Sequence, residues 1–324
     1  IPLVNILYYI YHPLLLLLWI LLAFLVLLLY LFLNPLSLML VLNTKKGEIR
    51  KKDQFMIGSI EYFFNGITPS NTGAQPMQVI EFSRFNIDSS RSTGALLINS
   101  TVNQVAIVIL CLLSLIYYQE LSNGIDAIQI LIVVGLMLNI LVLLLYIAIG
   151  CSKKIKNGLI KIVHFFTNLK IFKGNFKDTS VKFESYCTEA QNAFKETFKH
   201  KGKFFLATLF KLLSLLVFYS LPFFILKALN LPISFREIGL VIAMTTFSIA
   251  MTCFIPTPGA SGGIEFAFQS LFVNLKGVSK SVAVSGMMLW RFITYYLLMI
   301  LSLIIYLFLE YRIKKNKKRI QLEV

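Results

Sequence analysis

The strongest constraint in this sequence is a series of apolar runs that are each long enough to cross a lipid bilayer. About 20 mostly apolar residues cross the hydrocarbon core as a helix, and the run from Leu14 to Leu42 exceeds this length with only Asn34 and Pro35 interrupting it. Further runs cover Gly94 to Tyr118, Ile125 to Gly150, Phe204 to Leu229, Ile238 to Phe254 and Val282 to Leu309. With 57% hydrophobic and 14% charged residues, the chain cannot build a water-soluble surface. The sequence therefore predicts an all-α polytopic membrane protein with about six long transmembrane helices.

Charge follows the same organisation, because most basic residues lie between the apolar runs. The net charge is +16, and 23 of the 31 Lys and Arg residues fall into the three zones 45–52, 153–203 and 312–319. Cytoplasmic loops are enriched in Lys and Arg, so these zones and the C-terminus are expected on the cytoplasmic side of the membrane. The charge thus indicates topology and contact with anionic lipid. Because no recognition motif accompanies it, nucleic acid is not an expected partner.

Two apolar segments, 55–85 and 256–275, are broken by proline and glycine and are expected to enter the membrane without crossing it. The number of crossings between the basic zone at 153–203 and the basic tail must be even, and a re-entrant 256–275 closes this topology. The predicted organisation is one integral membrane domain, with a first half at 14–150, amphipathic cytoplasmic helices at 151–203, a second half at 204–310 and a tail at 311–324.

The amphipathic pattern in the cytoplasmic segment fits either the bilayer surface or packing against helix ends, and both interpretations stay open. Its apolar positions recur at helical spacing: Ile155, Leu159, Ile162, Phe166 and Leu169, and then Phe183, Cys187, Ala190, Phe194 and Phe198.

A six-residue pattern, T-P-x-x-[S/T]-G, occurs once in each broken segment. Its candidate binding residues are Thr68, Pro69, Thr72 and Gly73 in the first copy, and Thr257, Pro258, Gly259, Ser261 and Gly262, followed by Gly263, in the second. Paired interrupted segments in two halves are typical of a transporter's central site and are compatible with an inverted repeat. A helix that restarts after such a turn presents unpaired N–H groups that favour an anion such as a lipid phosphate. Alternatively, both turns simply join packed helices.

Charged residues inside apolar spans need a partner or a polar cavity. Arg291 lies within the last run, and Glu265, just after the second turn, is its candidate partner. This pair could hold the turn at rest or exchange for a lipid headgroup, and it could equally be a structural ion pair. Three other charged residues flank the first turn or lie at the membrane interface, and both positions stay open; Lys211 is close enough to the start of its span to extend to the interface. The three are Glu61, Glu81 and Arg84.

No metal, cofactor or catalytic site is predicted. The four cysteines lack metal-ligand spacing, and His12, His164 and His200 lack acid–base spacing. Because the sequence starts at Ile1, a preceding segment is expected.

The segment Pro256-Thr257-Pro258-Gly259-Ala260-Ser261-Gly262-Gly263-Ile264-Glu265, followed by Arg291 and Tyr295-Tyr296, resembles a motif of the lysylphosphatidylglycerol synthase transmembrane, or flippase-like, family. The turn at Thr68 to Gln75-Pro76 is similar to that family's first turn, although Ser70-Asn71 and Ala74 stand where glycines would be expected. The resemblance implies membrane-embedded lipid translocation, in some members fused to a soluble domain that transfers an aminoacyl group to phosphatidylglycerol. No such domain is recognised in these 324 residues, so no enzyme activity is expected.

The favoured function is therefore a flippase-like transporter that moves a phospholipid, aminoacylated or not, or another lipid-linked substrate between leaflets. Its expected partners are membrane lipids, above all anionic phospholipid, with a homo-oligomer left open. Three alternatives remain: a carrier for a small solute or ion with a midplane site, a membrane partner of a separate synthase, and a membrane enzyme acting on lipid-linked substrates.

Overall fold

The computed structural model describes residues 3–42, 44, 47–122, 126–154, 157–158, 160–161, 184–185, 187–189, 191–192, 194–196, 201–252, 255–275 and 277–322. All regular elements in these residues are helices, which confirms the predicted all-α membrane class. Most of the predicted amphipathic helices between 153 and 203 lie outside the described residues.

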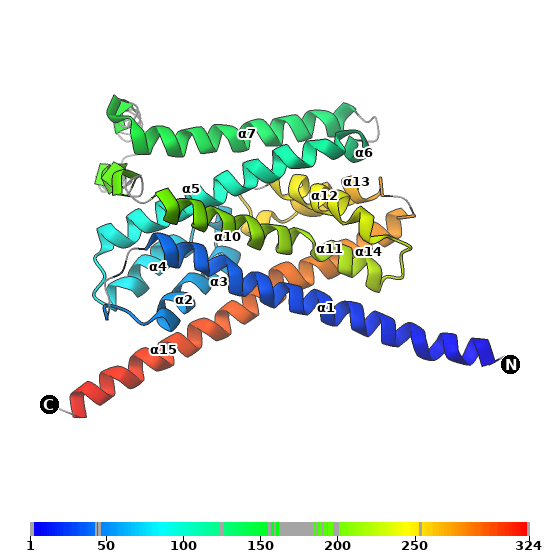
Figure 1. Ribbon diagram of the computed structural model, residues 1–324, viewed down its shortest axis with the longest axis horizontal. Coiled ribbons are helices and arrows are strands. Elements are labelled where there is room, and N and C mark those ends of the chain that lie inside the picture. Colours follow the sequence, from blue (N-terminus) through cyan, green and yellow to red (C-terminus); the bar gives the residue numbers. More distant parts are fainter. Residues whose placement is uncertain are drawn as a thin grey trace.

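Five helices in the described part of the chain are long and apolar enough to cross a membrane. Several of them are continuous stacks of shorter elements. They are α1 (Leu3–Val41), α5 to α6 (Ser89–Ser114, η2 Leu115–Tyr117, Tyr118–Ser122), α7 (Asp126–Cys151), α10 to α11 (Lys201–Tyr219, Leu221–Ala228), and α14 to α15 (Lys280–Arg291, η6 Phe292–Leu297, Leu298–Leu322). Helix α1 packs along α10, and α14 to α15 crosses α1 at an angle (Figure 1).

The two ends of this bundle differ in charge. The basic end, at the left of Figure 1, holds Arg50–Lys52, the start of α10 at Lys201, and the end of the α15 span at Arg312–Lys315. The opposite end holds α6, the start of α7, and the connection before η4 (Phe235–Glu237). Basic segments that lie far apart in the sequence are therefore gathered on one side, as a membrane topology requires.

One of the six expected runs, Ile238 to Phe254, does not form a long helix. Its helix α12 spans Ile238–Ala250 and has 13 residues, which gives a length of about 20 Å at 1.5 Å per residue. The chain then unwinds before Pro256 and Pro258, because proline provides no N–H for a continuing helix. After η5 (Pro258–Ala260), α13 (Gly263–Phe272) returns toward the opposite end. We call α12, η5 and α13 the second hairpin.

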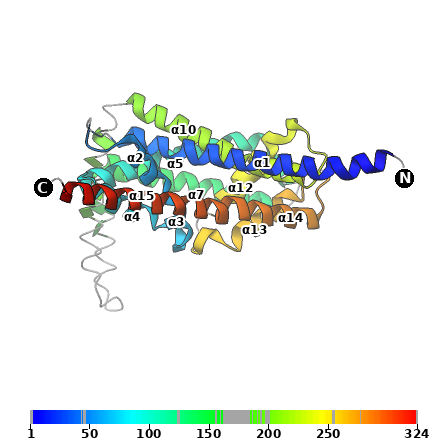
Figure 2. The same ribbon diagram turned by 90° about the horizontal axis from the view of Figure 1, so that it is seen from below.

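The first broken segment forms a similar hairpin that begins and ends at the basic end (Figure 2). It contains α2 (Lys51–Ser59), α3 (Glu61–Gly66), η1 (Pro69–Asn71) and α4 (Ala74–Ser83), and we call it the first hairpin. The turn η1 packs against η5. The tips of the two hairpins therefore meet after entering from opposite ends, and Pro69, Asn71, Pro258 and Ser261 of these tips stay exposed.

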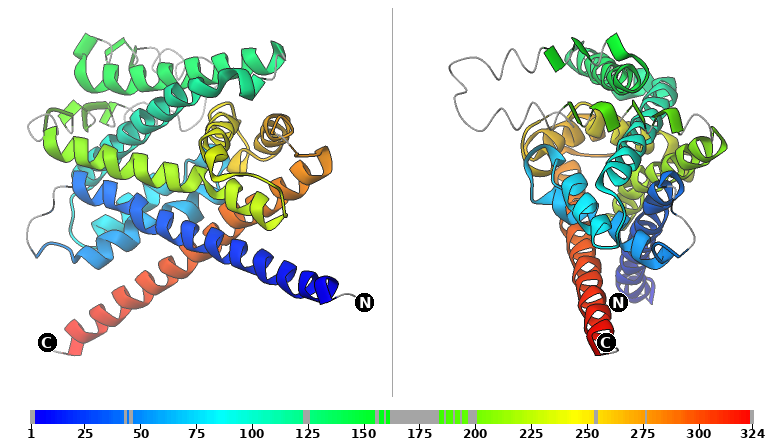
Figure 3. Two further views of the ribbon diagram at one scale, coloured as in Figure 1. Left: turned by 45° about the vertical axis from the view of Figure 1, so that its right-hand side comes forward. Right: turned by 90° about the vertical axis from the view of Figure 1, so that its left-hand side faces the viewer.

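The order of the elements repeats with reversed direction. In the first half α1 is followed by the first hairpin and α5, and in the second half α10 to α11 is followed by the second hairpin and α14 to α15. Each helix of one half runs opposite to its counterpart, and α7, which lies between the halves in the sequence, is at the edge of the bundle (Figures 1 and 3). This is the arrangement of an inverted repeat.

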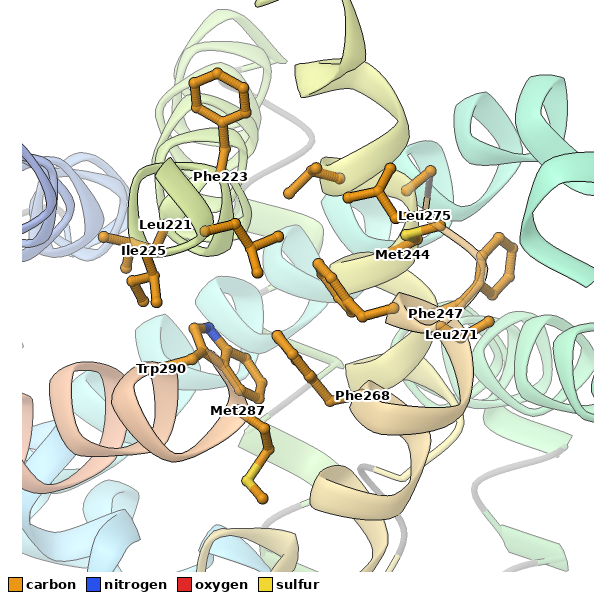
Figure 4. Close-up of a cluster of buried hydrophobic side chains, with 14 of the residues drawn as sticks. Leu221, Phe223, Ile225, Met244, Phe247, Phe268, Leu271, Leu275, Met287 and Trp290 are labelled. Atoms are coloured by element: carbon orange, nitrogen blue, oxygen red, sulfur yellow. The ribbon is translucent and has the colours of Figure 1, made fainter. Parts of the chain in front are cut away.

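Aromatic packing fixes the second hairpin against its neighbours. Phe268 of α13 stacks on Phe272 with ring centroids 3.9 Å apart and on Trp290 of α14 at 4.8 Å. Phe247 of α12 and Ile225 of α11 complete the cluster (Figure 4). Because these side chains are almost fully buried, α12 and α13 are packed firmly against α11 and α14. The tip η5 extends from them to contact η1.

Helix α7 packs loosely by comparison. Only 17% of its apolar window is buried, against 56% for α5. Its main polar attachment is Asn139, which is 1% exposed and donates to the carbonyl oxygens of Gly135 (2.8 Å) and Ala250 (3.1 Å). Gln104 of α5 donates in turn to the Asn139 side-chain oxygen at 2.9 Å. One asparagine thus connects α7 to α5 and α12.

We expect Asn139→Ala to destabilise the protein by about 1–2 kcal/mol, because an interhelical hydrogen bond in a membrane protein is worth up to this amount. The measurement is the midpoint of thermal unfolding in detergent. The control is Leu141→Ala on the same helix, whose side chain is 52% exposed and should matter little. An unchanged midpoint in Asn139→Ala would show that α7 is held by other contacts.

Candidate functional site

A polar cavity of about 410 Å³ lies where the tips of the hairpins meet. Both hairpins and the surrounding helices contribute to its wall, and the cavity is partly open. Most of its lining side chains are polar or aromatic, and the lining includes Tyr30 and Asn34 (α1), Glu61, Asn65 and Gly66 (α3), Asn71 (η1), Gln75 and Gln78 (α4), Asn99, Asn103 and Gln104 (α5), Tyr146 (α7), Lys211 (α10), Gly259 (η5) and Tyr295 (η6). The fold therefore places a polar space inside an otherwise apolar bundle.

Most of the twelve binding residues predicted from sequence lie outside the wall of this cavity. The structure describes all twelve, and only Gly259 belongs to the cavity wall. The two turns are nevertheless brought together, since η1 packs against η5. The assignment of the twelve to substrate binding remains a prediction.

The first turn is closed by its own side chains. Thr68 Oγ1 accepts the N–H of Gly73 at 2.9 Å, and Asn65 Oδ1 accepts the N–H of Ala74 at 3.1 Å. A Cβ on Gly73 would lie 2.5 Å from the Thr68 side chain, so glycine permits this close approach. The expectation of unpaired amides does not hold for these two N–H groups, because capping side chains satisfy them.

The second turn depends on unusual backbone angles. Gly259, Ala260 and Gly262 have φ values of 60°, 52° and 90°, in a region where side chains other than glycine are disfavoured. The turn is tied across its width by Thr257, whose hydroxyl donates to the Ser261 carbonyl oxygen at 3.0 Å. The Gly262 N–H then donates to Glu265 Oε2 at 2.6 Å, so Glu265 caps the start of α13.

The predicted partnership of Glu265 and Arg291 is present. Arg291 Nε lies 2.8 Å from Glu265 Oε1, with side-chain exposures of 11% and 24%. The Arg291 Nη2 atom also donates to Ser261 Oγ at 3.2 Å. One arginine of α14 therefore holds both the turn and the first residues of α13.

Tyr295 connects the two halves of the molecule, and sequence reasoning recorded it only as part of the family resemblance. Its hydroxyl donates to the Gly66 carbonyl oxygen at 2.7 Å, and its ring lies 4.6 Å from the Arg291 guanidinium carbon. A Cβ on Gly259 would come within 2.4 Å of the same ring. Tyr295 lies on η6, a π-helical turn, and such turns often occur at functional sites.

A buried charged network occupies another part of the wall, and its role was missed. Lys211 is 2% exposed and does not extend to the interface as expected, because its Nζ atom donates to Asn34 Oδ1 at 2.6 Å. Asn34 donates in turn to Glu61 through a short hydrogen bond. A charge in an apolar environment needs such partners. The sequence signal was present, since Asn34 and Lys211 both interrupt apolar runs.

The remaining charged residues near the first hairpin lie at the basic end and serve packing. Arg84 pairs with Glu81 at 2.9 Å and with Glu310 of α15, and Arg312 pairs with Asp53 at 3.0 Å. Burial raises the pKa of the Glu81 carboxyl group, and the neighbouring Arg84 opposes this shift. Among the residues that the structure describes, no cluster of His, Cys, Asp and Glu could hold a metal ion.

The two glycines of the second turn give separate predictions. Alanine at a positive φ costs about 1–2 kcal/mol, so Gly259→Ala and Gly262→Ala should both destabilise the protein. Gly259→Ala should cost more, because its Cβ also meets the Tyr295 ring, whereas nothing lies within 4 Å of a Cβ on Gly262. Unfolding free energies of the two variants test this. Equal losses would mean that the Tyr295 contact adds no constraint.

Lys211→Met should destabilise the protein by about 1–3 kcal/mol, because it leaves the Asn34 side-chain oxygen without its buried donor and removes the positive charge that faces Glu61 through Asn34. The double variant Lys211→Met with Glu61→Gln should recover most of this loss. The measurement is a double-mutant cycle on unfolding free energy, with Lys201→Met at the exposed start of α10 as the control. Simple additivity would show that Lys211 and Glu61 do not interact.

Comparisons with known proteins agree with this architecture. The family described as "Lysylphosphatidylglycerol synthase TM region" matches residues 3–302. A UPF0104 membrane protein of Pyrococcus horikoshii is 27% identical over 246 residues, which cover 74% of this chain and 71% of that relative. No solved structure matches this chain. With five apolar spans and a family match along nearly its whole length, the chain is a multi-pass membrane protein that belongs to the lysylphosphatidylglycerol synthase transmembrane-region family.

Proposed function

We propose that this protein moves a lipid with a polar headgroup between the two leaflets of a cytoplasmic membrane. The observation that carries the proposal is the polar cavity at the meeting point of two hairpins that enter from opposite ends. Irregular backbone at membrane depth is tolerated where it is buried in protein or lines a polar cavity. Paired broken helices that meet at the midplane form the binding sites of many transporters.

The orientation follows from the basic end. Loops rich in Lys and Arg stay in the cytoplasm, and the first hairpin begins and ends among such residues. The first hairpin therefore opens to the cytoplasm and the second to the outside. A headgroup could reach the shared cavity from either side if the two hairpins open in turn.

The surface around Arg291 is apolar and accessible to lipid. Met288, Phe292 and Tyr296 follow one another at four-residue spacing along α14 and η6 and are 62%, 56% and 52% exposed. Phe266 of α13, next to Glu265, is 66% exposed. A lipid tail can lie along such an apolar surface while its phosphate approaches Arg291, which can bind phosphate through two parallel hydrogen bonds.

The family match also favours a lipid substrate, because the family's description names a lysylphosphatidylglycerol synthase. Glu265 would then act as an internal substitute for the lipid phosphate, pairing with Arg291 when no lipid is bound. A carrier for a small solute is the second candidate, favoured by the opposite charges of Glu61 and Lys211 in the cavity wall. Transport of a water-soluble solute would not need the apolar surface beside Arg291.

We expect Arg291→Ala to slow lipid exchange between leaflets about tenfold or more, because a charge-assisted hydrogen bond contributes about 1.5–3 kcal/mol and each 1.36 kcal/mol is a factor of ten in rate. The assay follows tail-labelled anionic phospholipid in proteoliposomes by quenching of the outer leaflet. The control is Arg91→Ala, which removes an arginine paired with Glu48 at the basic end. Equal rates for the wild type and a folded Arg291→Ala variant would exclude Arg291 from transport.

A further inference from the structure

The cavity wall is unusually rich in side-chain amides. Of the residues that line it, eight are asparagine or glutamine: Asn34, Asn65, Asn71, Gln75, Gln78, Asn99, Asn103 and Gln104. An amide carries both donor and acceptor atoms and no charge. The groups that these side chains offer to the cavity therefore indicate the chemistry of its ligand.

Three glutamines are held by their amino groups. Gln75 Nε2 donates to Ser100 Oγ at 2.8 Å, Gln104 Nε2 donates to Asn139 at 2.9 Å, and Gln78 Nε2 donates to the carbonyl oxygens of Ile57 (3.0 Å) and Gly58 (3.3 Å). The structure's described residues give no partner to the Oε1 atoms of these glutamines. Each therefore has its orientation fixed and offers a carbonyl oxygen, which accepts hydrogen bonds.

Two asparagines are held by their side-chain oxygen atoms. Asn65 Oδ1 accepts the Ala74 N–H at 3.1 Å, and Asn99 Oδ1 accepts the Ser37 hydroxyl at 2.9 Å. Within the described chain, neither Nδ2 group has a partner. These side chains therefore offer N–H donors to the cavity.

The charges of the wall cancel. Glu61 and Lys211 are the charged residues that line the cavity in the described chain, and Asn34 connects them. An ionised phosphate would need mainly donors and positive charge, and an ammonium group would need mainly acceptors. A hydroxyl group both donates and accepts, so it matches a wall with fixed donors, fixed acceptors and no net charge.

We propose that the cavity binds the uncharged, hydroxyl-rich part of a lipid headgroup, such as a glycosyl or glycerol group. This inference rests on the proposed lipid transport and specifies its substrate class. The volume of about 410 Å³ lies within the range of about 300–1,000 Å³ for small-molecule sites. Tyr30, Tyr146 and Tyr295 add ring surfaces to the wall. Because Tyr295 also contacts Arg291, hydroxyl groups in the cavity and a phosphate at Arg291 would lie on either side of this ring.

The test compares three lipids with identical acyl chains: glucosyl-diacylglycerol, phosphatidylglycerol, and phosphatidylethanol, which keeps the phosphate charge but lacks the hydroxyl groups of phosphatidylglycerol. Native mass spectrometry on protein purified in a detergent without a sugar headgroup gives relative binding. We expect the two hydroxylated lipids to bind about tenfold tighter than phosphatidylethanol, because an unpaired polar wall rejects an analogue that lacks hydrogen-bonding groups. Equal binding of phosphatidylglycerol and phosphatidylethanol would overturn the inference.

Variants assign the preference to the cavity. Asn103 lines it, and no hydrogen bond of its side chain is found in the described residues. Asn103→Leu should reduce the preference for hydroxylated lipids several-fold, Asn103→Ser should retain more of it, and Gln119→Leu, at an exposed amide of α6, should leave it unchanged. An unchanged preference in Asn103→Leu would contradict a cavity location.

Leaflet exchange of the same three lipids in proteoliposomes separates this inference from the proposed function. Selective binding without exchange would reject transport and leave the hydroxyl site standing. Exchange that is equally fast for all three lipids would support transport and reject hydroxyl selection.

Discussion

A backbone that enters hydrocarbon and turns back must find partners for its N–H and C=O groups within the protein, because lipid offers none. Both hairpins of this protein meet that requirement at the same place. Thr68 and Asn65 satisfy amides of the first turn, and Glu265 satisfies an amide of the second. The two tips also pack against each other. The irregular backbone is therefore stabilised by side chains of its own hairpin and by the opposite tip.

The contacts that hold the tips together also connect the two halves. Tyr295 joins the second half to the Gly66 carbonyl group of the first, and Lys211 of the second half reaches Glu61 of the first through Asn34. Apolar packing joins the halves as well, because α1 packs along α10 and α11, and α5 packs along α10 and α12. Relative movement of the halves would therefore have to rearrange these helix interfaces in addition to the polar contacts.

Sequence reasoning found the parts of this structure that leave a local pattern. Apolar length located the spans, proline and glycine located both turns, and an isolated arginine in an apolar run led to the pairing of Arg291 with Glu265. It overestimated the length of α12, because the hydropathy of an apolar run does not show where the helix ends ahead of the two prolines. It also placed Lys211 at the interface, although the side chain is buried against Asn34, and it missed the cavity amides. Which face of an apolar helix turns toward a cavity depends on neighbours from distant segments, and no periodicity in one run records this.

The length of α1 has a mechanical consequence. Its apolar span of 28 residues measures about 42 Å as a helix and exceeds a hydrocarbon core of about 30 Å, so the helix must tilt. A thinner bilayer increases this hydrophobic mismatch and a thicker one relieves it. Asn34 belongs to this helix and lies between Glu61 and Lys211. A change of bilayer thickness that alters the tilt of α1 would therefore move Asn34 relative to Glu61 and Lys211. The lipid composition of the membrane would then affect the geometry of the site as well as supply its substrate.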